Sequence, residues 1–164
     1  MPASRDTFER QHSMGMLGGW NKWMTDQRRY AAASVGLLLL RLGFGLMMML
    51  GHGLSKLTGF AEKSGEFPDP LGVGNSLSMA LAIFAEIGCS ILIVLGLATR
   101  VAAIPLIITM VVAVFVIHGS DPWPKKEFAM LYLVPFLTLV FTGAGRFSLD
   151  AAIFCRCSRE NQSL

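Results

Sequence analysis

Four long apolar stretches, separated by polar connections, dominate the pattern of hydrophobic and polar positions along the chain. They cover residues 33–51, 77–97, 101–117 and 128–143. An α-helix needs roughly 20 apolar residues to cross a hydrocarbon core of about 30 Å. Residues flanking the two shorter stretches can extend each helix by a turn, so the pattern predicts four membrane-spanning helices.

The connections between these stretches predict how the helices are arranged. Only a few residues join the second stretch to the third, and the polar segment 118–127 joins the third to the fourth. Pro105 and Pro135 lie inside the last two stretches, where a membrane helix tolerates a kink because neighbouring groups satisfy the freed carbonyl. We therefore expect an all-α polytopic membrane protein, a four-transmembrane-helix up-and-down bundle.

Composition and charge agree with a lipid environment and give an orientation. The chain is 53% hydrophobic and only 15% charged. The two ends and the second connection hold nine basic residues, whereas the first and third connections hold four (Lys56, Lys63, Lys125 and Lys126). This asymmetry predicts cytoplasmic N and C termini. It also accounts for the net charge of +3, so we expect the bilayer and no nucleic acid as a partner.

The two ends of the chain differ from the apolar centre. Residues 1–30 form a cytoplasmic segment in which Trp20 and Trp23 stand among charges, a pattern that suits an interfacial helix or a disordered leader. The first apolar run begins too far along the chain for a secretory signal. We expect a membrane domain over residues 31–151 and a basic cytoplasmic tail over residues 152–164.

Two charged residues lie inside the apolar stretches. Arg41 falls in the first and Glu86 in the second. A charge at this depth usually faces the bundle interior and has a partner, and their estimated depths are similar, so we expect Arg41 and Glu86 to form a buried polar pair. The pair could simply lock two helices in register or could belong to a functional polar track.

A second set of polar residues is expected near the outer membrane face. His52 and Lys56 are four positions apart, which places them on one face of a helix that continues that far. His118 ends the third stretch, and Trp123 and Glu127 precede the fourth. Each of these ionisable residues alone could be a solvated helix end. Together they are candidates for binding a quinone or another substrate, because histidine exchanges protons, lysine stabilises a reduced anion and a carboxylate relays a proton.

The sequence gives weak support for metals or disulfides. His52 and His118 lie on separate helices without the spacing of a metal or haem motif, so no metal site and no covalent cofactor are predicted. Cys89 is most simply a small apolar residue. Cys155 and Cys157 form a CxC unit on the cytoplasmic side, where structural disulfides are uncommon.

With these residues assembled, the chain resembles the DoxX family of small four-helix bacterial membrane proteins over roughly residues 35–151. The matching units are LLRLGFG and HGLSKL, GLATR at the inner turn, HG at the end of the third stretch, and GAGRFSLD. The resemblance implies a subunit associated with redox chemistry in the bacterial inner membrane. Some members are DoxD-like components of thiosulfate:quinone oxidoreductase, and others are membrane partners of thiol and oxidative-stress enzymes.

The resemblance also carries over polar motif residues by position. These are Arg41, His52, Lys56, Glu86, Arg100, His118, Glu127, Ser148 and Asp150. Three of them, Arg100, Ser148 and Asp150, make an inner-face motif. Ser and Asp favour turns and helix caps, so a capping role ranks ahead of catalysis for Ser148 and Asp150.

These observations lead to three hypotheses about function. The first is an integral membrane subunit of a quinone-linked or thiol-linked redox complex, at most an oxidoreductase subunit that needs partner proteins, with quinone as the candidate cofactor. The second is a non-catalytic anchor or assembly subunit for a partner enzyme. The third is a small proton-coupled transporter using the buried charges as a relay.

Overall fold

The computed structural model describes residues 5–153, which form helices joined by turns and one longer loop, with no strand among them. The predicted all-α class is confirmed. Cys155 and Cys157, with most of the predicted basic tail, lie outside the described residues. The side chains of Trp20 and Trp23 also lie outside the described part.

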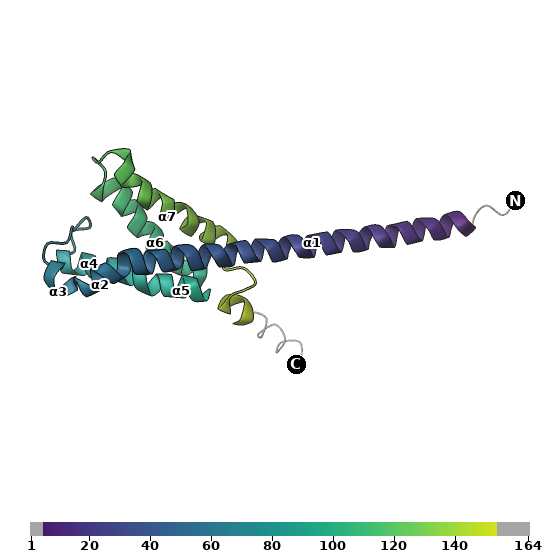
Figure 1. Ribbon diagram of the computed structural model, residues 1–164, viewed down its shortest axis with the longest axis horizontal. Helices are drawn as coiled ribbons and strands as arrows, with labels where there is room; N and C mark the ends of the chain where they lie inside the picture. The colour runs from purple at the N-terminus through teal and green to yellow at the C-terminus, as the bar shows by residue number, and fades with distance from the viewer. Residues whose placement is uncertain (1–4, 154–164) are drawn as a thin grey trace.

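The first apolar stretch belongs to a helix that is much longer than the stretch itself. Helix α1 (Arg5–Met48) leads directly into a π-helical turn, η1 (Met49–Gly53), and then into α2 (Leu54–Thr58). Its N-terminal part extends away from the other helices (Figure 1). The helix continues through residue 30, and the boundary expected there between a cytoplasmic segment and the membrane domain stays a prediction.

The remaining helices follow in chain order. After α3 (Phe60–Lys63) and a loop come α4 (Asn75–Ile83), the π-helical turn η2 (Phe84–Cys89), α5 (Ser90–Leu95), α6 (Thr99–Val112), the π-helical turn η3 (Ala113–Ile117) and α7 (Trp123–Thr142). The tight turn between α5 and α6 uses a left-handed backbone at Gly96 (φ 70°) and Ala98 (φ 47°).

Among the described residues, three helical segments are long and apolar enough to cross a membrane: Arg28–Thr58, Asn75–Leu95 and Thr99–Ile117. They correspond to the first three predicted spans. Helix α7 has 20 residues and covers most of the fourth stretch, but Lys125, Lys126 and Glu127 stand near its start, and it is not among the three. The count of four spans stays a prediction.

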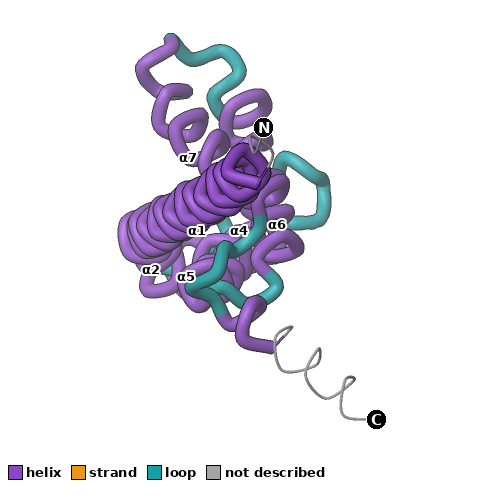
Figure 2. Tube along the Cα trace, turned by 90° about the vertical axis from the view of Figure 1, so that its right-hand side faces the viewer, coloured by secondary structure: helices purple, strands orange, loops and turns teal. Residues whose placement is uncertain are grey.

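The helices pack around a small apolar core. α6 lies along α7 and α1 along α5, and the core includes Met48, Ile93, Leu106, Phe136 and Leu139, all 0% exposed. Figure 2 shows α1 in front, with α7 above it and α2 and α5 below. In Figure 1, α6 and α7 diverge from α1 toward the end where α3 lies. We call this the His52 end of the bundle and the opposite end the Arg41 end.

Candidate ligand-binding cavity at the His52 end

A cavity of about 560 Å³ lies at the His52 end of the bundle. Its walls come from α1–α2, the loop before α4, α4–η2, α6–η3 and the start of α7, and most of the lining side chains are apolar. The polar or ionisable lining residues are His52, Lys56, Ser78, Glu86, Thr109, His118, Lys125 and Tyr132. The cavity thus combines apolar walls with a small number of polar groups, as small-molecule sites commonly do.

Three π-helical turns surround this cavity. η1 carries His52, η2 carries Glu86, and η3 ends directly before His118. A π turn holds an extra residue relative to an α-helical turn, which changes the direction of the side chains that follow, and such turns are frequent at functional sites. A π-helical turn in each of three helices thus places three ionisable residues around the cavity.

Gly53 allows η1 and η2 to approach closely. A Cβ atom on Gly53 would lie 2.6 Å from a side-chain carbon of Ile87 and 3.2 Å from the Glu86 backbone carbon. Only a residue without a side chain fits there, and the close approach brings Lys56, one turn further on, within reach of Glu86.

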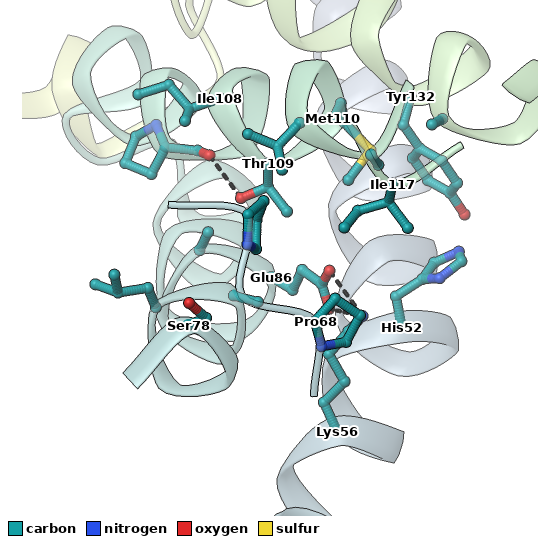
Figure 3. A pocket seen from close by; sticks show the side chains of 18 of the residues that line it. His52, Lys56, Pro68, Ser78, Glu86, Ile108, Thr109, Met110, Ile117 and Tyr132 are labelled. Carbon is teal, nitrogen blue, oxygen red and sulfur yellow. Dashed lines mark hydrogen bonds and ion pairs between the residues drawn. The ribbon is translucent and has the colours of Figure 1, made fainter. Parts of the chain in front are cut away.

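Glu86 forms its ion pair with Lys56. The Lys56 Nζ atom donates to both carboxylate oxygens of Glu86, at 2.8 and 2.7 Å (Figure 3). The Glu86 side chain is 4% exposed and that of Lys56 is 25% exposed. Glu86 is therefore buried and paired, but its partner is Lys56 at the cavity rather than a residue deeper in the bundle.

The predicted pair of Arg41 with Glu86 is wrong. Because Gly53 packs against Glu86, the carboxylate sits at the level of residue 53, which is twelve residues beyond Arg41, or about 18 Å along a helix. Arg41 is fully buried and instead donates to the backbone carbonyls of Ile93, at 3.5 Å, and Phe147. Its Nε atom has no partner within the described residues.

His118 joins a second polar pair at the edge of the cavity. Its Nδ1 atom lies 2.8 Å from Oδ2 of Asp121, and Lys125 Nζ lies 3.5 Å from the other oxygen of Asp121. The hydrogen bond with His118 holds the pKa of Asp121 below its usual value. Trp123 and Glu127, both expected near the candidate site, are exposed and do not line the cavity.

His52 lies against Tyr132, a residue that the sequence reasoning missed. The two rings meet edge to face with centroids 5.3 Å apart, and Tyr132 stacks on Phe136. Figure 3 shows both side chains beside the Lys56–Glu86 pair. Tyr132 is 6% exposed, and within the described residues its hydroxyl makes no hydrogen bond. The feature of the sequence that could have identified Tyr132 is its position, as a tyrosine, inside an apolar stretch.

The loop between α3 and α4 contributes the side of the cavity formed by Phe67, Pro68, Pro70 and Leu71. Asp69 fixes this loop, because its carboxylate accepts hydrogen bonds from the backbone N–H groups of residues 73 and 74, at 3.1 and 2.7 Å, and from Ser78 Oγ at 2.7 Å. The Ser78 hydrogen bond is the main reason that the pKa of Asp69 lies below its usual value.

Comparison with known proteins places this architecture in a family. The family model described as DoxX matches residues 36–119, half of the chain. The chain belongs to the DoxX family. Among DoxX relatives, it is 31% identical over 121 residues to the Bacillus subtilis protein named "Putative oxidoreductase CatD", covering 73% of this chain and 88% of that protein.

Two further relatives have names that assign no reaction. An uncharacterized Haemophilus influenzae protein is 36% identical over 129 residues, which cover 72% of this chain and 90% of the relative. The uncharacterized membrane protein Rv3486 of Mycobacterium tuberculosis is 31% identical over 152 residues, covering 79% and 88%. No solved structure matches the chain. The chain is thus a DoxX-family membrane protein.

At the Arg41 end, side chains of the GLATR and GAGRFSLD units of this DoxX chain have a structural role: they hydrogen-bond to backbone groups at the turns and helix ends. Asp150 accepts hydrogen bonds from the backbone N–H groups of Ala98, at 2.7 Å, and Thr99, at 3.1 Å, at the start of α6. Ser148 accepts from the backbone of residue 151 at 3.1 Å. Both therefore cap helices, and Arg100 donates to the carbonyl of residue 141 at 3.3 Å. These contacts hold the turns together and leave no side chain of the motif at the cavity.

No metal centre is evident in the part of the chain that the structure describes. Groups of three or more His, Cys, Asp or Glu side chains placed to hold an ion do not occur between residues 5 and 153. The polar groups at the cavity are those of Lys56, Glu86, Tyr132, the two histidines and a few other lining residues.

Proposed function

We propose that this chain is the membrane subunit of a redox assembly and that its cavity binds the head group of a quinone. The observation that carries the proposal is the meeting of apolar walls with His52, Tyr132, His118 and the Lys56–Glu86 pair in one cavity. A quinone head is a flat apolar ring with two carbonyl oxygens, which need hydrogen-bond donors inside an otherwise apolar site. The name of the Bacillus subtilis relative, "Putative oxidoreductase CatD", supports a redox role.

The polar groups suit the charge changes of a quinone. The Lys56 ammonium group can stabilise negative charge on a reduced ring, and the Tyr132 hydroxyl and a histidine N–H can donate to a carbonyl oxygen. Glu86 neutralises Lys56 when the cavity is empty, which limits the cost of burying a cation. A partner protein carrying a flavin or a dithiol would supply the electrons, which is the quinone-linked or thiol-linked arrangement expected from the sequence.

The open side of the cavity suits the long apolar tail of a membrane quinone. Phe84, Ile108 and Phe128 line the cavity and are also 59%, 53% and 68% exposed. In a membrane helix bundle, such exposed apolar side chains contact lipid. A tail can therefore pass from the cavity into the bilayer without leaving an apolar environment.

We also propose the bacterial inner membrane as the location, with both termini in the cytoplasm and the cavity near the outer face. The distribution of basic residues supports this orientation. Labelling of single cysteines by an impermeant maleimide in intact cells tests it. A cysteine at exposed Lys63 should react from outside, and one at exposed Arg28 only after the cells are opened.

Quinone extraction tests the proposed function. The protein is purified gently from native membranes, and organic extraction measures the bound quinone in wild type, His118→Ala and Tyr132→Phe at equal folded yield. We expect near-stoichiometric quinone in wild type and less in both variants, by about fivefold to tenfold for the lost Tyr132 hydroxyl. Tyr30→Phe is the matched control, because Tyr30 is exposed on α1 away from the cavity.

The second candidate function, a non-catalytic anchor, has one observation in its favour. The N-terminal part of α1 extends beyond the other helices, where a partner protein could bind it (Figure 1). Mass spectrometry of co-purifying proteins separates the two functions. Partners retained by wild type and by His118→Ala, with no quinone in either, would support the anchor. The transporter hypothesis loses its proposed Arg41–Glu86 relay, because those side chains do not pair.

A further inference from the structure

The pair of His118 and Asp121 fixes which nitrogen of the histidine is available to a ligand. Nδ1 of His118 lies 2.8 Å from Oδ2 of Asp121. An ionised carboxylate only accepts hydrogen bonds, so Nδ1 must carry the hydrogen. Within the described residues, the other ring nitrogen, Nε2, makes no hydrogen bond, and His118 lines the cavity. Nε2 is therefore the ring nitrogen that stays available for a hydrogen bond with a ligand in the cavity.

The ionised state of Asp121 supports this assignment of the hydrogen. The pKa of Asp121 is lowered, first by its hydrogen bond with His118 and further by the nearby Lys125 ammonium group. Asp121 is therefore an ionised carboxylate at neutral pH, and it favours the tautomer of His118 that carries the hydrogen on Nδ1.

The fixed tautomer gives Nε2 opposite roles in the two protonation states of His118. In the neutral ring, Nε2 has a lone pair and accepts a hydrogen bond, which a quinol hydroxyl can donate and a quinone carbonyl cannot. In the protonated ring, Nε2 donates, which suits a quinone carbonyl oxygen. The two redox forms of one ligand thus prefer different protonation states of the same side chain.

We propose that the His118–Asp121 pair makes the cavity select between the redox forms of its ligand according to pH, holding quinol when His118 is neutral and quinone when it is protonated. This inference rests on the proposed function, because it concerns the same ligand and the same cavity. Asp121 acts as a positioning residue, since it sets the hydrogen on His118 without lining the cavity itself.

The other charged groups around the cavity do not provide the same switch. Lys56 and Glu86 pair with each other at 2.7 Å and together carry no net charge, while Lys125 faces Asp121 from α7. His52 is the other cavity histidine, but it lies against the ring of Tyr132 and has no carboxylate partner among the described residues. Of these two histidines, only His118 has a carboxylate among the described residues that fixes its tautomer.

Binding measurements on both redox forms test the proposal. Decylubiquinone and decylubiquinol are titrated anaerobically into the purified full chain in nanodiscs at about pH 5 and about pH 8. We expect the ratio of the two Kd values to shift by about tenfold between these pH values, in favour of quinol at the higher pH. Asp121→Asn should shrink this shift to about twofold or less, because either nitrogen can then carry the hydrogen.

Two variants keep the test interpretable. His118→Gln should bind both forms with a ratio independent of pH, because an amide donates and accepts at every pH. Glu62→Gln removes a carboxylate from exposed α3 and should behave as wild type. A pH-independent ratio in wild type, or an unchanged shift in Asp121→Asn, would overturn the inference while leaving quinone binding intact. Binding of neither form would overturn the proposed function and this inference with it.

Discussion

Replacing Lys56 by methionine should destabilise the bundle strongly, because it leaves the Glu86 carboxylate buried without a partner. Lys56 Nζ lies 2.8 and 2.7 Å from the two Glu86 oxygens, and the carboxylate side chain is 4% exposed. At an effective dielectric constant of about 20, two unit charges at this distance attract by about 6 kcal/mol. Desolvation offsets part of that attraction, and removing one member of a buried pair typically costs 3–5 kcal/mol.

The double variant Lys56→Met/Glu86→Leu should recover most of this loss, since replacing a buried pair by apolar side chains is often neutral. The assay is thermal unfolding in one detergent, where 3–5 kcal/mol corresponds to a fall in Tm of roughly 6 to 20 °C. Lys63→Met, on the exposed surface of α3, is the matched control and should unfold like wild type. A loss below about 1 kcal/mol in Lys56→Met, the range of an exposed pair, would refute the reasoning.

Three further predictions concern the turns and the loop. Gly96→Ala should cost about 3 kcal/mol, measured by thermal unfolding, because Gly96 has φ 70° and an added Cβ would collide with the Arg41 guanidinium group. Asp150→Ala should cost about 1 kcal/mol in the same assay, because two N–H groups at the start of α6 lose their acceptor. Acidification below about pH 4 should free the loop around Asp69, because a carboxyl group with a lowered folded pKa contributes stability that is lost as it protonates. Limited proteolysis between residues 64 and 74 measures this release.

Each of these predictions has its own control. Gly36→Ala should not destabilise the protein, because nothing lies within 4 Å of the added atom; equal losses at Gly36 and Gly96 would contradict the account of the turn. Asp150→Asn, which retains one acceptor oxygen, should lose less than Asp150→Ala, and the reverse order would contradict capping. Asp69→Asn should expose the loop to protease at neutral pH, and a loop that stays protected in this variant would show that Asp69 does not hold it.

The sequence predicted the features of this protein that depend on amino-acid composition and on the spacing of residues along a helix. Apolar stretches of nearly membrane length, bounded by charges, give helices at the predicted places. His52 and Lys56, four positions apart, line the same cavity as His118, which agrees with the predicted placement of His52 and Lys56 on one face of a helix. The capping role for Asp150 also follows from residue type and position.

Side-chain partners could not be predicted from the same patterns. Estimated depths placed Arg41 opposite Glu86, but depth alone ignores the close approach at Gly53, which places Glu86 beside residue 53 and within reach of Lys56. Three π-helical turns alter the direction of the side chains around the cavity, and no periodic pattern of apolar residues reveals an inserted residue. Tyr132 was missed because an aromatic residue in a span usually belongs to the core, which Tyr132 also does.

The measurement that tests the central claim most directly is photolabelling with an azido-quinone in native membranes, followed by mapping of the labelled peptides. The account predicts labels on the segments that line the cavity, around His52, Glu86 and Tyr132, and loss of these labels when decylubiquinone competes. Labels confined to the outer faces of the helices, or labels that decylubiquinone leaves unchanged, would contradict a quinone site in this cavity.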